Sequence, residues 1–346
     1  MKYYFIIAFF GILLRLVLMP ITSHSDLWDF YFSGHLFAYQ GVFNIYDYLA
    51  NLGNSDLARN YGTNYFTYPP LTYFLLGLFA FIFKPFSDGG FFSWSIANYP
   101  NVFHNPQVFK ALFLTKLPYI FFDLGTAIFL AKLFTKEKEK KIAFTLWIFN
   151  PLAIYTSFMT GQFDIMAVFA VVTALYFVSV KKENLSVISL GLGGALKMFP
   201  LLLLPFFIFS LGKNWKSKIT LAVLGLLPYF ITILPFISSS AFRRVSLFSS
   251  QSEKMLFMSF PVSGAEGLYV FIMILVLLFA YSAYNPGKFK IWQYCMAVMF
   301  AFFSVTHYHP QWMLWLAPFF VIQTVGDRFK FIWLWLVMFA SWIGIT

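Results

Sequence analysis

The sequence predicts an all-α, polytopic membrane protein, and three observations lead to this fold class. Of its 346 residues, 60% are hydrophobic and only 11% are charged, whereas a soluble domain carries about 25% charged residues. The mean hydropathy is +0.74, and a water-soluble fold of this composition would expose large apolar patches. The net charge of +11 comes from short basic clusters between apolar runs, which is the pattern of cytoplasmic membrane loops and not of a nucleic-acid groove.

Apolar runs of suitable length recur along the whole chain. A spanning helix needs roughly 20 mainly apolar residues, and with nine such runs and one divided stretch we expect about eleven spans. The divided stretch is 185–211, where Lys197 and Pro200 lie between two short apolar runs, and we expect two short helices that meet at the outer face. The nine runs are 3–20, 109–134, 142–158, 163–180, 219–237, 262–284, 291–306, 312–325 and 331–345.

Basic clusters set the expected orientation. Under the positive-inside rule, the run Lys136–Lys141 and four similar clusters lie in the cytoplasm, together with the N-terminus. No small-residue cleavage site follows the first apolar run, so we expect this run to remain as the first span. The apolar run 69–83 is short and opens with two prolines, which favours an interfacial or re-entrant helix. The four further clusters are Lys181-Lys182, Lys213–Lys218, Lys288–Lys290 and Arg328–Lys330.

We therefore expect one membrane domain over residues 1–346, without a soluble domain. Residues 21–108 form its first external loop and carry juxtamembrane helices, and residues 109–346 form the remaining helix bundle. The cytoplasmic loops are short, so we expect the active site on the external face of the cell (plasma) membrane.

Two acidic residues follow the first apolar run directly. If the chain continues as a helix, Asp26 and Asp29 lie at positions i and i+3 on one face. A carboxylate at the membrane rim suits a general base or a metal ligand. The alternative is structural: Ser25 or Asp26 caps a helix and Asp29 lies in its first turn.

A polar turn and a lone lysine form the next candidates. Gln162 and Asp164 lie between two apolar runs and are candidates for binding sugar hydroxyls, although Asp164 also suits the first turn of the second helix. Lys197 lies at the break in the stretch 185–211 and would hold a phosphate there. Its alternative is to extend its side chain to the membrane interface.

The last candidates are basic. Arg243 and Arg244 are adjacent in an external segment and suit phosphate recognition, although an exposed loop tolerates them equally. His307 and His309 lie at i and i+2 in a short outer turn and suit a phosphate or a metal. The single cysteine, Cys295, excludes an intrachain disulfide and a cysteine-based zinc site. We expect no cofactor and no dedicated metal site, and leave a divalent metal open.

Taken in order, these segments resemble the GT-C superfamily of membrane glycosyltransferases over about residues 10–320. The nearest likeness is to dolichyl-phosphate-glucose glucosyltransferases, and related bacterial and archaeal polyprenyl-phosphate-mannose mannosyltransferases are similar. The resemblance rests on the order of several short motifs, since no single motif is specific. The motifs are Ser25-Asp26, Tyr68–Thr72, the helix with Asp123, Asn150-Pro151 through Asp164, Leu196-Lys197 through Pro205, Arg243-Arg244 with Leu247-Phe248, and His307-x-His309.

The chain departs from the resembled families at two positions. Pro310-Gln311 stands where the glucosyltransferases usually have Glu-Lys after His-x-His, and the stretch to Trp315 is closer to the mannosyltransferases. Asp164 stands where the nearest eukaryotic relatives tend to have Gln. These differences leave the sugar open between mannose and glucose.

The resemblance implies an inverting hexosyltransferase that moves a hexose from a polyprenyl-phosphate-sugar donor to an acceptor hydroxyl. It implies that Asp26 accepts the proton of that hydroxyl, and that Asp29 orients the acceptor or replaces Asp26 as base. Sugar faces would stack on aromatic rings such as that of Tyr68. The expected partners are the donor, membrane lipid and a glycan, lipid-linked or protein acceptor, with no nucleic acid. The leaving phosphate would be stabilised by Arg243, Arg244, His307, His309 and Lys197.

Two alternatives from other classes remain. A lipid or sugar transporter or flippase would place ionisable residues near the bilayer midplane and show symmetry between its halves. Here the acids gather near the expected outer rim, and the halves differ. A non-catalytic assembly factor would tolerate Asp26→Asn without loss of function.

Overall fold

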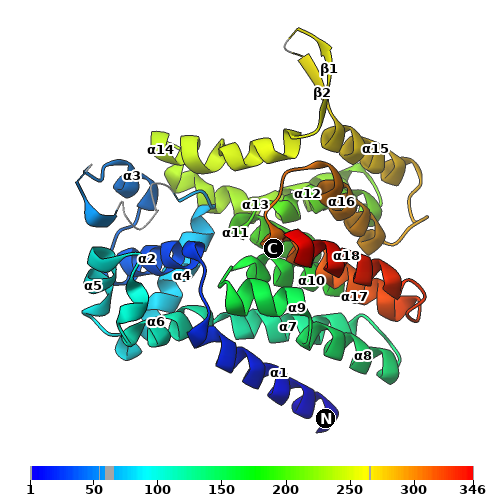
Figure 1. The fold of residues 1–346 in the computed structure, drawn as a ribbon. Coiled ribbons are helices and arrows are strands. Elements are labelled where there is room, and N and C mark those ends of the chain that lie inside the picture. The colour runs from blue at the N-terminus through cyan, green and yellow to red at the C-terminus, as the bar shows by residue number, and fades with distance from the viewer. Residues whose placement is uncertain (1, 54, 59–65, 265, 346) are drawn as a thin grey trace.

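The computed structural model describes residues 2–53, 55–58, 66–264 and 266–345. Over these ranges the chain is almost wholly helical, with one two-stranded hairpin that projects from the helical body (Figure 1). Most of the longer helices lie side by side, and α1 (Lys2–Ile21) runs along one edge of the body.

The first part of the chain forms a group of helices beyond the end of α1. Its two longest members are α2 (Ser25–Gln40) and α4 (Pro70–Phe83). They pack so closely at Gly77 that a Cβ there would lie 2.3 Å from the Phe37 ring. As expected from the two prolines, α4 begins at Pro70, where a missing N–H costs nothing. The other elements are α3 (Ile45–Ala50), η2 (Lys84–Phe86), α5 (Phe91–Asn98), η3 (Val102–His104) and α6 (Gln107–Lys116).

Among the described residues, four helical segments are long and apolar enough to cross a membrane, and a fifth is added if the bent pair of α4 and α5 counts as one span. That pair bends by 116°, as a broken span or a re-entrant loop does. The protein is therefore a multi-pass membrane protein. The four segments are α1; α6 with α7 (Tyr119–Lys132); α8 (Glu137–Ile148) with α9 (Pro151–Ala153) and η4 (Ile154–Met159); and α13 (Trp215–Ile233) with η5 (Leu234–Phe236).

The expected count of about eleven spans is not confirmed. Three of the expected spans form α10 (Asp164–Ser179), α16 (Ile291–Val305) and α18 (Ile332–Ile345). These helices have 14 to 16 residues, fewer than the roughly 20 of a straight crossing. An apolar run does not reveal whether protein or lipid surrounds it, and α10 is buried along most of its length inside the protein.

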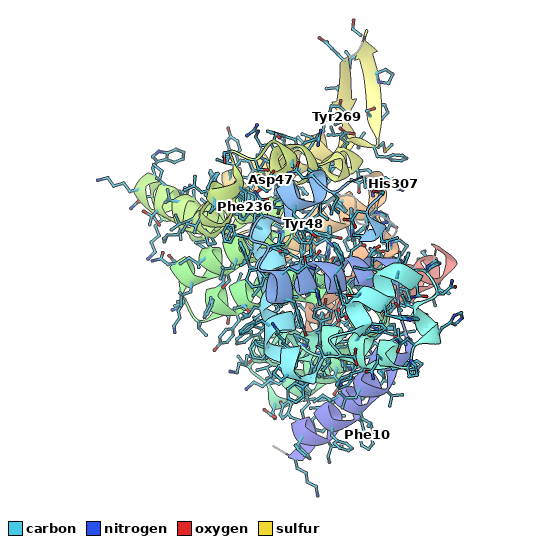
Figure 2. All side chains as sticks on the ribbon, turned by 90° about the vertical axis from the view of Figure 1, so that its left-hand side faces the viewer. Phe10, Asp47, Tyr48, Phe236, Tyr269 and His307 are labelled. Carbon is cyan, nitrogen blue, oxygen red and sulfur yellow. The ribbon has the colours of Figure 1, made fainter. Side chains whose placement is uncertain are left out.

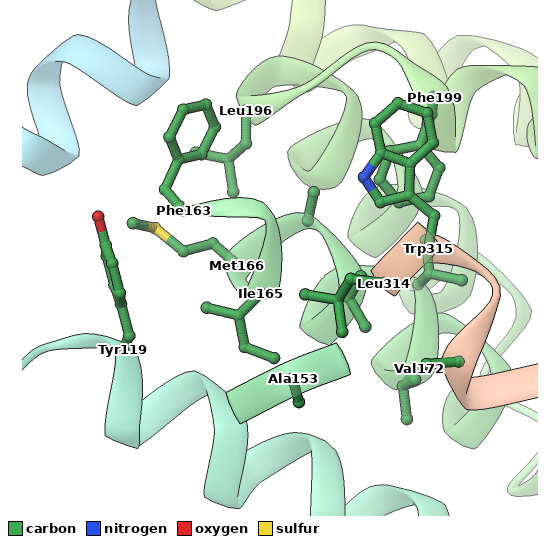
Figure 3. Close-up of a cluster of buried hydrophobic side chains, with 14 of the residues drawn as sticks. Tyr119, Ala153, Phe163, Ile165, Met166, Val172, Leu196, Phe199, Leu314 and Trp315 are labelled. Carbon is green, nitrogen blue, oxygen red and sulfur yellow. The ribbon is translucent and has the colours of Figure 1, made fainter. Parts of the chain in front are cut away.

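The hydrophobic core is centred on α10. Figure 3 shows its Ile165, Met166 and Val172 among side chains from several other elements. Tyr119 of α7 and Leu314 of η8 (Pro310–Trp315) are completely buried in this core. The core therefore holds the turn before α10 in place against segments that are distant in the sequence.

The stretch 185–211 forms two helices, as expected. α11 (Glu183–Leu196) ends at Lys197, whose extended backbone (φ −152°, ψ 133°) separates it from α12 (Phe199–Leu211). The carbonyl of Leu196 accepts a 2.6 Å hydrogen bond from Thr72 Oγ1 of α4. The break is thus tied to the first part of the chain.

The expected helix over 262–284 is wrong in its first turns. Residues Ser259–Ser263 (β1) and Glu266–Tyr269 (β2) pair as an antiparallel hairpin, and only then does α15 (Val270–Tyr284) begin. Gly264 lies within the expected helix and has a positive φ of 52°, which is outside the right-handed helical range. This local feature outweighs the apolar composition of the run.

Several of the remaining segments, α3, η6 (Arg243–Leu247) and η7 (Ser250–Leu256), contribute residues to the cavity described below. In Figure 2, Asp47 of α3 lies near Phe236 of η5, and Asp47 Oδ1 accepts a 2.6 Å hydrogen bond from Ser239. Phe10 of α1 lies at the opposite end of the molecule. The elements not yet named are α14 (Ser240–Phe242) and α17 (Ala317–Gly326).

Candidate functional site

A cavity of about 470 Å³ lies between the start of α2, the residues before α4, the start of α12, and the segments η6, η7 and η8. Its wall combines carboxylates, cations, hydroxyls and aromatic rings, whereas cavities that stay empty in proteins are apolar. Five of the ten predicted site residues line it, so these five converge in space although they lie far apart in the sequence. The polar wall residues include Asp26, Asp29, Tyr68, Lys197, Ser246 and His309.

Asp26 lies in the first turn of α2, where a negative charge complements the helix dipole. Its Oδ2 accepts a 2.8 Å hydrogen bond from Gln162, and the ring of His24 lies 3.4 Å from its Oδ1. Burial alone would raise the pKa of this carboxyl. The hydrogen bonds from His24 and Gln162, together with the charge of Lys197, outweigh burial and lower the pKa to about 2. Asp26 is therefore a fixed anion.

Asp29 lines the same cavity from one turn further along α2. It lies beyond the first turn, so the alternative interpretation that it stabilises the helix start is wrong. Among the described residues it has no hydrogen bond or ion pair. Burial, and next the negative charge of Asp26, raise its pKa to about 7. The two carboxylates thus differ: one is bonded and charged, the other is unbonded and titrates near neutrality.

Lys197 lies at the break between α11 and α12 and reaches into a cage of aromatic rings. Its Nζ donates a 2.7 Å hydrogen bond to Oδ1 of Asp164, which also accepts one of 2.6 Å from Trp315. Both side chains are almost fully buried, so each compensates the charge of the other. The rings within 6 Å of Nζ are those of Tyr68, Phe163, Trp312 and Trp315.

Two predicted residues support the cavity from behind its wall. Gln162 and Asp164 are buried and do not line the cavity; they hold Asp26 and Lys197 instead. Tyr68 does line it, and its carbonyl accepts hydrogen bonds from Tyr46 (2.7 Å) and Ser246 (3.0 Å). These bonds join the segment before α4 to α3 and η6.

Three predicted residues lie elsewhere. Arg243 donates to the carbonyls of Ile237 (2.7 Å) and Ser238 (2.9 Å), so it secures the end of the preceding turn. Arg244 and His307 are exposed, and neither lines the cavity. The adjacent arginines thus do not form a phosphate site at this cavity.

His309 lines the cavity and contacts Lys254, which does not line it and was not among the predicted site residues. The ammonium of Lys254 meets Nε2 of His309 and lies 5.4 Å from the Trp312 ring centroid. Burial lowers the pKa of both groups, and in His309 the charge of Lys254 adds to this effect. His309 is therefore a neutral acceptor for the lysine. A positive charge in an expected external segment was the available sequence signal.

Lys116 is the main supporting residue that sequence reasoning missed. It is completely buried, and its Nζ donates to the carbonyls of Met19 (3.0 Å), Thr22 and Met159 (2.9 Å). These carbonyls belong to the end of α1, the link to α2 and the end of η4. The lysine thus joins the two segments that carry Asp26 and Gln162. The available signal was a lysine inside a long apolar run.

Over the described part of the chain, no three histidine, cysteine or acidic side chains gather where they could hold a metal ion. Near the cavity, Asp26, Asp164 and His309 take part in the contacts described above, whereas Asp29 has no such contact.

The fold and cavity define a multi-pass helical membrane protein with a polar, aromatic-lined cavity. Residues 44–345 match the family described as PIG-U, GPI transamidase subunit, and the chain belongs to this family. No curated protein and no solved structure matches the chain.

The family corrects the expected function. Its description is that of a transamidase subunit, so the expectation of a hexosyltransferase with a polyprenyl-phosphate-sugar donor as partner is wrong. The alternative of a transporter or flippase is likewise unsupported, and the specific likeness to GT-C glycosyltransferases is not confirmed. The membrane assignment holds, but the match supports neither the plasma membrane nor an active site on the external face. Short motifs in order describe a helix arrangement, and an arrangement does not fix a reaction.

Proposed function

We propose that the chain is the substrate-binding subunit of a membrane transamidase complex, and that its cavity holds the headgroup of a phosphate-bearing glycolipid. The family description supplies the complex, and the GPI in its name is such a glycolipid. The observation that carries the proposal is the cavity itself, which joins charged, hydroxyl and aromatic groups to an apolar side.

The dimensions and wall of the cavity suit a glycolipid headgroup. Its volume of about 470 Å³ falls within the range of about 300–1,000 Å³ for small-molecule sites. The rings of Trp312 and Trp315 stack 5.0 Å apart, and Phe199 stacks on Trp315 as well, so the ring of Trp312 offers the flat face for a sugar ring. Leu201, Leu202 and Met255 add apolar wall, which would contact the first acyl carbons.

The bonding of Asp26 and Lys197 favours a binding role over a catalytic role for these two residues. A general base works best with a pKa near the working pH, whereas Asp26 has a pKa of about 2 and is held by Gln162. Lys197 is neutralised by Asp164 and is surrounded by rings. These residues have fixed positions and charges, as a preformed binding site requires.

The test is to identify the lipids that the full chain retains in nanodiscs. We expect native mass spectrometry to show retention of glucosaminyl-phosphatidylinositol in preference to diacylglycerol. Trp312→Ala removes one ring of the wall and should weaken retention about tenfold, which corresponds to about 1.4 kcal/mol. Trp333→Ala is the matched control, because Trp333 is 55% exposed on α18 and does not line the cavity.

Equal retention of both lipids would overturn the proposal, and so would equal loss in the two tryptophan variants. The first result would mean that the cavity does not select a phosphate-bearing headgroup. The second would mean that retention reflects the lipid-facing surface and not the cavity.

A further inference from the structure

The hairpin of β1 and β2 carries apolar side chains that no other described segment covers. Every residue of β1 is exposed, and so are the residues of β2 apart from Gly267. Phe260, Val262 and Leu268 are 55%, 61% and 50% exposed. Because the hairpin projects from the helical body (Figure 1), the body does not shield these side chains. An exposed apolar surface of this kind indicates a contact beyond the chain itself.

The two faces of the hairpin differ in their side chains. Residues directly opposite each other in an antiparallel pair lie on the same face, and neighbours along a strand alternate between faces. Phe260 pairs with Leu268, so one face carries these two large apolar side chains. Pro261 pairs with Gly267 on the opposite face at the same level. The hairpin is therefore strongly apolar on one face only.

The hairpin leads directly into a helix flank that is also apolar. β2 ends at Tyr269 and α15 begins at Val270, whose backbone N–H donates a 3.0 Å hydrogen bond to the carbonyl of Met258. The hairpin is thus joined to α15 without a flexible link. α15 contains no charged residue, and its Val276 and Leu277 are 57% and 66% exposed. In a multi-pass membrane protein, such a helix flank faces lipid.

The backbone of the hairpin limits the depth at which it can lie. Over the described residues the sheet has two strands, so each strand has an outer edge whose N–H and C=O groups lack a neighbouring strand. Open edges of this kind do not occur in the hydrocarbon region, because water does not reach them there. Glu266 is the one charged residue between positions 257 and 269, and it also requires water or lipid headgroups. The hairpin can therefore lie at the headgroup level but not deeper.

A protein partner is the other occupant that an apolar surface suggests, and the area argues against it. A stable protein interface buries about 800 Å² on each side. One aromatic side chain buries about 150–250 Å², so three half-exposed side chains fall well short of that area. Lipid has no such minimum, and the hairpin continues a flank of α15 that faces lipid. Area and continuity both favour a lipid surface.

We propose that the hairpin is an interfacial membrane anchor, with Phe260 and Leu268 directed into the bilayer and Pro261 and Gly267 directed to water. Aromatic side chains concentrate at the membrane interface, and the apolar face of an interfacial element enters the bilayer by about 5–10 Å. The segment η7 directly precedes the hairpin and contributes Met255 to the cavity wall. The anchor therefore sets the level of this part of the wall relative to the membrane.

The test places a fluorescent label on each face of the hairpin in the full chain in nanodiscs. Leu268→Cys and Gly267→Cys are neighbours on opposite faces, and a Cβ at Gly267 meets only ordinary contacts of 3.6 Å or more. The native Cys295 is completely buried, so labelling is confined to the introduced cysteine. Lipids with a nitroxide on the upper acyl chain should quench the Leu268 label at least about twofold more than the Gly267 label. Iodide in the solvent should show the opposite order.

Val276→Cys on α15 is the reference for a position within lipid. Val276 lies about 9 Å further along the helix than Val270, so lipids with a nitroxide at the chain end should quench its label more than the Leu268 label. The three labelled positions lie outside the core, and the thermal unfolding midpoints of these proteins should match that of the native chain. None of these measurements depends on the ligand of the cavity.

Three outcomes would overturn the proposal. If iodide quenches the Leu268 and Gly267 labels equally and neither nitroxide lipid quenches them, the hairpin stands in water, where a protein partner could cover it. If both labels are protected from all three quenchers, the hairpin packs against protein, such as a second copy of the chain. If the lipid nitroxides quench the Gly267 label more strongly, the opposite face meets the membrane.

Discussion

Gln162 donates a 2.8 Å hydrogen bond to Asp26 across 136 positions of the sequence. The bond joins the first turn of α2 to the turn before α10, and so places a wall residue of the cavity against the centre of the core. Gln162 is almost fully buried, whereas Asp26 is partly exposed to the cavity. The rigid core thus sets the position of the carboxylate.

Removing the donor should loosen this contact. Gln162→Leu keeps the side-chain volume but removes the amide that donates to Asp26. We expect the free energy of unfolding to fall by about 1.5 kcal/mol, which is at the low end for hydrogen bonds to charged groups because Asp26 is partly exposed. The measurement is the thermal unfolding midpoint in detergent. Gln40→Leu, at the exposed end of α2, is the control and should leave the midpoint in place. Equal midpoints for all three proteins would contradict this role.

Asp26 should contribute stability that depends on pH. Its folded pKa is lowered from 3.8 to about 2, so the contribution is complete above pH 4 and is lost as the pH falls towards 2. In Asp26→Asn this part of the acid dependence should disappear, which stability measurements from pH 5 to pH 2 would show. An unchanged acid profile would mean that the carboxylate is equally stabilised in the unfolded chain.

Breaking the buried pair of Lys197 and Asp164 should destabilise the fold much more than replacing both of its members. Lys197→Met leaves a buried carboxylate without its cation, and we expect the free energy of unfolding to fall by about 3–5 kcal/mol. Adding Asp164→Asn to this variant removes the remaining charge and should restore most of the loss. Denaturant unfolding of the native chain, both single variants and the double variant gives the coupling free energy. Additive effects of the two substitutions would show that the pair is not coupled.

Lys116 should act through the backbone that it holds. Lys116→Met leaves three carbonyls without a donor, at about 1 kcal/mol or more each. Hydrogen exchange should accelerate at residues 19–26 and 159–164, which lie at the two segments that Lys116 joins. Lys110→Met, an exposed position on the same helix, is the control. Acceleration spread evenly over the chain would indicate general destabilisation instead.

The sequence predicted the helical membrane fold, the first span and the break at Lys197, because each depends on local composition and on residues close together in the chain. It also predicted that Asp26, Asp29, Tyr68, Lys197 and His309 matter together, and all five line one cavity. The bonds that organise the cavity could not be predicted. Lys197 meets Asp164 from 33 positions away and Lys116 meets Met19 from 97, and such distances depend on tertiary packing. The hairpin was missed because the expected span 262–284 counted its residues with the apolar run that forms α15, although Gly264 and Gly267 lie among them.

The contact between α11 and α13 depends on a glycine and gives the last prediction. A Cβ on Gly191 would lie 2.1 Å from the carbonyl oxygen of Gly225, and small residues let membrane helices approach this closely. Gly191→Ala must separate the two backbones, so we expect the free energy of unfolding to fall by at least about 2 kcal/mol. Gly326→Ala, with open space around its Cβ, should be neutral or stabilising by up to about 1 kcal/mol. Similar thermal midpoints for the two alanine variants would mean that the helices pack less closely than described.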